Sequence, residues 1–202
     1  HDPGPDVDAL VNPNRPDDTA GLGHLCAAGV TFMALGAANR ELRTRGMSPE
    51  SLPDLLKLLD LVALATVADV VPLTGLNRAF VVKGLQVAQA RSNPGLAALI
   101  EVSRLSGPLR PYHFGFVLGP RINAGGRIGD AGMGARLLSS NDADEARHLA
   151  AELDTLNAQR QAIEAEAVES AIAMVERDNE VPPVILVRDL SLIHISEPTR
   201  PR

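Results

Sequence analysis

The sequence predicts a helix-rich α/β protein, and three observations lead to this fold class. The chain has 202 residues, 45% hydrophobic and 22% charged, so it can bury a core. Aromatic residues are scarce, with no Trp, one Tyr and four Phe. A core of Leu, Val, Ile and Ala suits helices packed on a sheet. Most apolar residues recur at helical spacing, and two short apolar runs, at residues 9–11 and 181–187, indicate strands.

The expected helices follow from apolar spacing and from stop signals. Residues 24–46 predict a helix with a basic last turn and a glycine stop at Gly46. The apolar run at residues 55–71 is too long for a typical strand of about five or six residues, so we expect a buried helix that ends at Pro72. Further helices are expected at residues 77–90 and 94–105, and residues 111–126 are expected to enter a glycine-rich loop as a helix or a strand.

Residues 142–179 predict one long amphipathic helix. Apolar residues recur there at alternating spacings of three and four, with Arg160 interrupting the stripe. If it is unbroken, its ~37 residues span about 55 Å at about 1.5 Å per residue. A helix of this length usually bridges two bodies, and residues 181–187 then predict the first strand of a following domain.

The charge pattern excludes several classes of protein. A net charge of −6 argues against a general nucleic-acid-coating protein. Residues 102–129 are an exception, because they contain four arginines and no acidic residue. Cys26 is the only cysteine, so neither a disulfide framework nor a cysteine zinc site is expected and a cytoplasmic protein is predicted. No apolar run is long enough to predict a membrane span.

Asp69 is the first candidate site residue. It ends the stretch of residues 58–69, which is otherwise apolar except for Asp60 and Thr66. An unpaired carboxylate is costly to bury, so Asp69 must be paired, solvated in a cleft or bound to a metal. The alternative for Asp69 is a helix-end aspartate that bonds to the next loop. Asp60 meets the same test and is expected to form a hydrogen bond within the fold.

The glycine-rich segment at residues 115–138 is the second candidate. It lacks the lysine of a Walker A loop and the third glycine of a dinucleotide fingerprint. Arg121, Asn123 and Arg127 could bind phosphate oxygens, with glycines letting the backbone approach closely. A tight turn with exposed arginines remains an equal alternative.

Five strings together resemble the RecJ family of single-strand-specific exonucleases, within the DHH (Asp-His-His) phosphoesterase superfamily. The resemblance covers residues 1–187. The strings are "VNPNRPDD", "GHLCAAGVTF", "LLDLVALATVADVVPLTGLNR", "LGPRINAGGRIGDA" and "LAAELDTLNAQRQAIE", and they occur in the family's order.

The resemblance implies a domain organisation. Residues 1–138 are expected to be the C-terminal portion of a DHH catalytic domain with a parallel sheet, and residues 139–180 the long connecting helix. Residues 181–189 would begin a second, DHHA1-type domain. Residues 190–202 resemble a translated sequencing adapter and are left out of the fold prediction, so the chain is expected to be truncated at both ends.

The resemblance also implies a chemistry. The family hydrolyses single-stranded DNA from the 5′ end with two divalent ions, Mn²⁺ or Mg²⁺. Asp69 matches the last metal-ligand aspartate, and Arg121, Asn123 and Arg127 match the signature loop near the cleft. Implied partners are single-stranded DNA, single-strand-binding protein and repair or recombination helicases.

Two departures from the family pattern limit what the chain can do alone. The upstream aspartate ligands are not in this sequence. His1 is a candidate for the last histidine of the Asp-His-His triplet and for a metal ligand, although fewer residues separate it from Asn12 than in the family. With at most two ligands, the chain alone is expected to be inactive. Alternatives are an oligonucleotide or cyclic-dinucleotide phosphodiesterase of the same superfamily, and a non-catalytic DHH scaffold protein.

Overall fold

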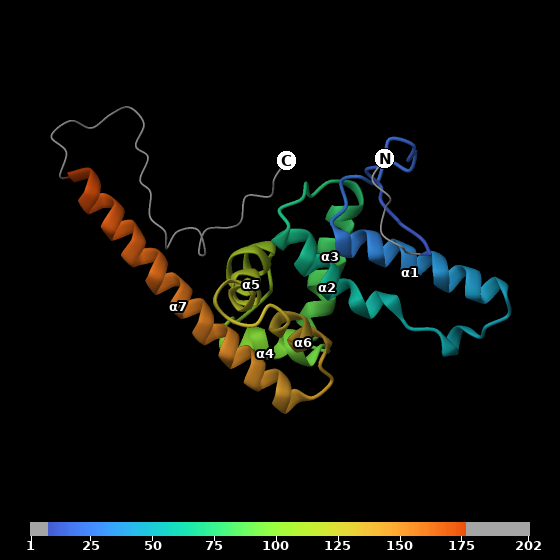
Figure 1. The fold of residues 1–202 in the computed structure, drawn as a ribbon. Coiled ribbons are helices and arrows are strands. Elements are labelled where there is room, and N and C mark those ends of the chain that lie inside the picture. Colours follow the sequence, from blue (N-terminus) through green and yellow to red (C-terminus); the bar gives the residue numbers. More distant parts are fainter. Residues whose placement is uncertain (1–7, 177–202) are drawn as a thin grey trace. The chain divides into compact units, whose positions relative to one another are not determined.

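The structure is a computed structural model that describes residues 8–176, and over this range all of its regular elements are helices (Figure 1). Within these residues the backbone forms no strand, so the strand expected at residues 9–11 is wrong. Leu10 and Val11 are 57% and 65% exposed, and no described strand lies beside them to bond with. The strand expected at residues 181–187 lies outside the described residues. The structure therefore confirms a helix-rich protein, without a sheet in the described range.

The helices match the expected segments closely. Those expected at residues 24–46, 55–71, 77–90 and 94–105 are confirmed with shorter or shifted bounds. Their bounds, with two short 3₁₀ turns, are α1 (Ala27–Thr44), η1 (Pro49–Ser51), η2 (Leu55–Leu58), α2 (Leu59–Ala68), α3 (Gly75–Gln89) and α4 (Pro94–Val102). The following elements are a π-helical turn η3 (His113–Leu118), α5 (Gly119–Ile128), α6 (Met133–Ser139) and α7 (Ala143–Glu176).

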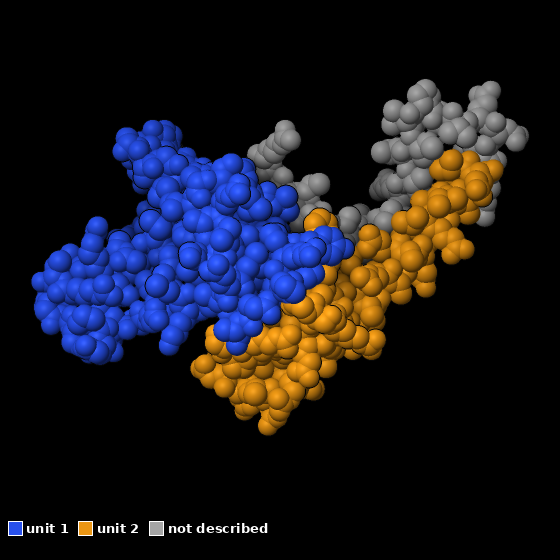
Figure 2. Space-filling view, turned by 180° about the vertical axis from the view of Figure 1, so that it is seen from behind, with its two compact units in different colours: residues 1–90, 108–115 blue, residues 91–107, 116–202 orange. Residues whose placement is uncertain are grey.

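The chain divides into two compact units (Figure 2). The first comprises residues 1–90 and 108–115, and the second comprises residues 91–107 and 116–202. In the first unit, α2 packs against α3, α1 and η2. The core there is built from Leu25, Leu59, Val62 and Phe80.

In the second unit, α4, α5 and α6 all pack against α7. The side chains that meet there are aliphatic, as the composition predicted, and Leu99, Leu118, Leu137 and Leu153 are fully buried. The first half of α7 therefore packs against the other three helices of this unit.

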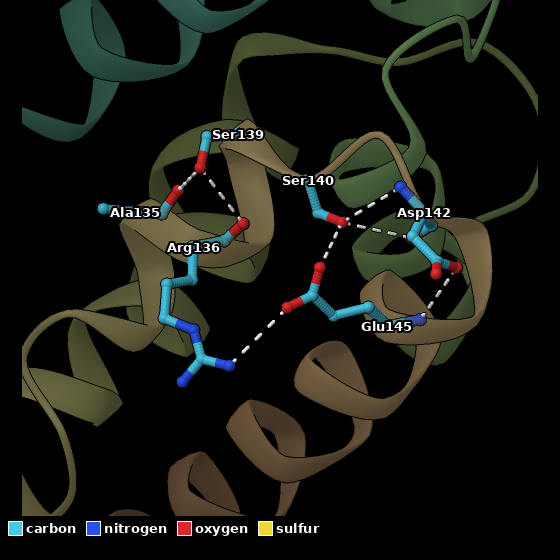
Figure 3. Close-up of polar contacts among 6 residues, drawn as sticks. All are labelled: Ala135, Arg136, Ser139, Ser140, Asp142 and Glu145. Atoms are coloured by element: carbon cyan, nitrogen blue, oxygen red, sulfur yellow. Dashed lines mark hydrogen bonds and ion pairs between the residues drawn. The ribbon is translucent and has the colours of Figure 1, made fainter.

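Polar contacts fix the start of α7 (Figure 3). The Asp142 carboxylate accepts hydrogen bonds from the backbone N–H groups of Asp144 and Glu145, at 2.8 and 3.3 Å. The Ser140 hydroxyl donates to the Glu145 carboxylate at 2.7 Å, and Arg136 lies 3.6 Å from the same carboxylate. These bonds satisfy N–H groups that a helix start leaves without partners. They also tie the end of α6 to the start of α7.

Helix α7 has 34 residues in the described range and confirms the long helix expected there. The predicted apolar stripe is buried at Ala146, Leu149 and Leu153, but Met174 near the other end is 43% exposed. Arg160, which interrupts the predicted stripe, makes polar contacts within α7. Its guanidinium donates hydrogen bonds to the buried Asn157 side chain and to Glu164.

Gly84 permits a close contact between α3 and α2, and this gives a stability prediction. A Cβ at Gly84 would lie 2.1 Å from the Leu59 carbonyl oxygen and 2.3 Å from the Ala63 Cβ. Gly84→Ala should therefore push α3 away from α2 and lower the free energy of unfolding by about 1–3 kcal/mol.

Gly36 in α1 is the matched control for chemical denaturation. A Cβ there would meet no atom within 4 Å, so Gly36→Ala should stabilise the helix by about 0.5–1 kcal/mol. Equal stabilities for the two variants would show that α2 and α3 are not in contact at Gly84.

Candidate functional site

Asp69 lies at the C-terminal end of α2, where the chain leaves the apolar interior. Its backbone N–H donates to the Ala65 carbonyl at 2.9 Å and completes the last helical turn. The side chain is exposed, and its carboxylate has no hydrogen-bond or ion-pair partner among the described residues. Of the three environments open to this carboxylate, the structure shows a solvated one. An oxygen ligand is thus available at the end of a buried helix.

Most of the glycine-rich segment is helical. Residues 119–128 form α5 and residues 133–139 form α6, with a short non-helical connection at residues 129–132. Arg121, Asn123 and Arg127 therefore lie on a helix and not in a tight turn, and the helical alternative for residues 111–126 is confirmed. The glycines permit close helix packing. A Cβ at Gly134 would lie 2.7 Å from the Ile122 Cγ2, and one at Gly125 would lie 2.9 Å from the Asp130 carbonyl oxygen.

The three candidate phosphate-binding residues therefore share one helix, but not one face. Asn123 and Arg127 are four residues apart and lie on the same side of α5. Arg121 precedes Asn123 by two residues, which in a helix places it on a different side. Asn123 is exposed, whereas Arg121 and Arg127 are half-buried.

Arg121 faces α7 and is engaged in the fold. Its Nε donates to Asp154 Oδ1 on α7 at 2.7 Å, and its Nη1 donates to the Val117 carbonyl oxygen at 2.8 Å. The Arg121 and Asp154 side chains are 19% and 37% exposed, so this ion pair is only partly solvated. Asp154 was not predicted from the sequence, because a partner 33 residues away leaves no local pattern.

The π-helical turn η3 leads directly into α5, and Pro120 gives a physical reason for it. A proline ring clashes with the carbonyl group four residues earlier in a regular α-helix and provides no N–H to bond with it. A wider turn over residues 113–118 accommodates Pro120. Arg121 then bonds to the Val117 carbonyl of this turn, which fixes how α5 begins.

Asp60 is the buried carboxyl group of the first unit. It is 1% exposed, and Oδ1 accepts a hydrogen bond from the Leu61 N–H at 2.8 Å, while Oδ2 has no partner among the residues that the structure describes. The expected hydrogen bond within the fold is present for one oxygen only. Burial raises the pKa of Asp60, and the backbone hydrogen bonds oppose this rise only in part.

Among residues 8–176, no group of three or more His, Cys, Asp or Glu side chains could hold a metal ion. Asp69 belongs to the first compact unit, and Arg121, Asn123 and Arg127 belong to the second. His1 lies outside the described residues. Of the candidate metal ligands, the described residues thus contain Asp69, and they do not form a complete metal centre.

Comparison with known proteins identifies relatives over most of the chain. No family model matches the sequence. The single-stranded-DNA-specific exonuclease RecJ of Dickeya dadantii is 42% identical over 178 residues, or 86% of this chain, and that of Escherichia coli is 40% identical over the same length. The chain is a relative of the RecJ exonucleases.

Solved RecJ structures agree with this relationship. The RecJ of Thermus thermophilus in complex with Mg²⁺ matches 80% of this chain, with a TM-score of 0.65 and 37% identity. A manganese-bound exonuclease RecJ matches the same share, with a TM-score of 0.67. The chain spans 31% of the length of the Dickeya and Escherichia relatives, and 24% and 39% of the two solved chains. The likeness therefore concerns a part of RecJ.

The Arg121–Asp154 ion pair can be measured by a double-mutant cycle. Arg121→Gln, Asp154→Asn and the double variant should give a coupling free energy of about 1 kcal/mol in chemical denaturation, because the pair is partly shielded from water. The pair of Arg45 and Glu41, with side chains 73% and 59% exposed, is the control and should couple more weakly. Equal coupling in the two pairs would show that Arg121 is not held by Asp154.

The raised pKa of Asp60 predicts how stability depends on pH. Well below the ordinary Asp pKa of about 3.9, the Asp60 carboxyl group is protonated in both the folded and the unfolded chain. The stability difference between Asp60→Asn and the unaltered chain therefore changes little with pH in that range. As the pH rises through the raised folded-state pKa, the unfolded chain releases the proton more easily and the unaltered protein loses stability. The stability of Asp60→Asn relative to the unaltered chain should thus increase with pH. Urea denaturation between acidic and neutral pH tests this, and a constant difference would contradict it.

Proposed function

We propose that this chain is part of a metal-dependent exonuclease that hydrolyses phosphodiester bonds of single-stranded DNA in the 5′ to 3′ direction, in repair and recombination. The observation that carries the proposal is the exposed carboxylate of Asp69, which has no partner among residues 8–176, in a chain about 40% identical to proteins named single-stranded-DNA-specific exonucleases. In this proposal residues 1–138 complete a parallel-sheet DHH domain, and residues 139–180 connect it to a second domain that begins at residues 181–189.

The cofactor is Mn²⁺ or Mg²⁺, as the metals bound in the solved relatives support. A carboxylate oxygen is the kind of ligand these hard cations prefer, so Asp69 fits as one ligand. His1 is proposed as a second ligand. Bound metal ions would polarise the scissile phosphate and lower the pKa of a bound water. Because the described residues provide Asp69 alone, the other ligands must come from elsewhere in the protein.

Three residues of α5 are proposed to bind or support the DNA backbone. Asn123 and Arg127 share a face and present an amide and a guanidinium, both of which can donate to phosphate oxygens. Arg121 acts differently in this proposal. Its bonds to Asp154 and Val117 hold α5 in place, so it supports the other two.

The proposed partners are single-stranded DNA, single-strand-binding protein and repair or recombination helicases, and the proposed location is the cytoplasm. None of the helices between residues 8 and 176 has the length and apolar character needed to cross a membrane.

Asp69→Ala tests the proposed active site in the complete protein that carries this segment. The unaltered protein should release nucleotides from the 5′ end of a long single strand with Mn²⁺, and should hydrolyse a dinucleotide poorly. Asp69→Ala should abolish release, because a metal ligand is lost, while the circular dichroism spectrum and melting temperature stay close to those of the unaltered protein.

Glu101→Ala is the matched control, because Glu101 is an exposed carboxylate at the end of α4. It should retain activity. The isolated 202-residue chain should release nothing. Activity retained by Asp69→Ala would remove Asp69 from the site, and metal-dependent activity of the isolated chain would show that it holds a complete centre.

A further inference from the structure

The Asn77 side chain joins two segments of the first unit that are far apart in sequence, and one of them directly follows Asp69. Its side chain is fully buried at the start of α3. Nδ2 donates to the His24 carbonyl at 2.8 Å and to the Pro72 carbonyl at 2.9 Å, while Oδ1 has no partner in the described part of the chain. Two carbonyl acceptors can be served only by the amino group, so this orientation of the amide follows from its surroundings. The side chain thus connects the segment before α1 to the segment after α2.

A second contact joins the same two regions on the other side of Asp69. The Cys26 Sγ lies 3.6 Å from the Thr66 Oγ1, and both residues are buried. Thr66 precedes Asp69 by three residues, and Pro72 follows it by three. Residues 24–26 therefore contact α2 just before Asp69, and the Asn77 side chain links them to the chain just after it.

The backbone between these two contacts is strained. Val70 has a φ of 55° and is 86% exposed. For a β-branched residue the left-handed region is unfavourable, and such conformations persist only where surrounding contacts impose them. The side chain of Val70 contributes little burial that could offset this strain. The contacts made by Asn77 and Thr66 lie on the two sides of this segment in sequence, and within it the Val70 N–H donates to the Val67 carbonyl at 3.1 Å.

We propose that Asn77 is a positioning residue for Asp69. By fixing Pro72 to His24, its amide holds the strained turn that directs the Asp69 carboxylate. The proposal rests on the function proposed above for Asp69, but the holding of the turn can be measured without it.

The first experiment is hydrogen exchange on the 202-residue chain. Asn77→Ala removes both donated bonds, so exchange at the N–H groups of Asp69 and Val70 should accelerate by about tenfold relative to that of Val81 in mid-α3. Asn39→Ala is the matched control, because Asn39 is also buried and donates to a carbonyl, that of Pro53, at 3.1 Å. It should leave the relative exchange at Asp69 and Val70 unchanged. If Asn77→Ala does not fold, Asn77→Ser is compared in its place.

The second experiment uses the complete protein. Asn77→Ala should lower kcat on single-stranded DNA by about tenfold and raise the Mn²⁺ concentration for half-maximal activity, with the DNA KM nearly unchanged. Asn39→Ala should change neither quantity. Unchanged exchange at Asp69 and Val70, or kcat and Mn²⁺ dependence like those of Asn39→Ala, would overturn the positioning role. An unaltered protein that hydrolyses no DNA would instead refute the proposed function, and the exchange result would still decide whether Asn77 holds the turn.

Discussion

Burial of α2 is the constraint on which the first unit depends. This helix has almost no polar face, and six of its ten residues are buried. A helix that is apolar on all sides must be covered on all sides, so α1, α3 and η2 pack around it. Gly84 allows α3 to approach closely enough to do this. The polar end of α2 is then the first point where a charged group can reach water, and Asp69 stands there.

The same kind of constraint explains the glycines of the second unit. Glycine-rich segments are typical of phosphate-binding loops, because glycine lets a backbone approach a ligand. At Gly125 and Gly134 the close neighbours are other parts of this chain. Small residues at these positions let α5, α6 and α7 pack closely, in the way that small residues let helices approach elsewhere. The glycines therefore determine the packing of α5, and its polar side chains are left to determine what it binds.

Much of the fold was accessible from local patterns, and the contacts that organise the site were not. The apolar run at residues 55–71 predicted α2, and the periodic stripe predicted α7, because both signals lie within one element. The end of α2 could be placed only near Pro72, since nothing in the local sequence predicts the left-handed conformation of Val70. Asn77 reaches His24 across 53 residues, and Arg121 reaches Asp154 across 33. Neither pairing has a periodic or compositional signature, so only the structure reveals them.

The electrostatics of α5 follow from this long-range pairing. Between residues 102 and 129 the sequence has four arginines and no acidic residue, which suggests a strongly positive surface. Asp154, on α7, forms an ion pair with Arg121 and neutralises its charge at a partly buried position, where an unpaired charge is costly. A count of charges along the segment thus overstates the positive potential near α5. The charge of Arg121 thus stabilises the packing of α5 on α7, and the proposed contacts with the DNA backbone are assigned to Asn123 and Arg127.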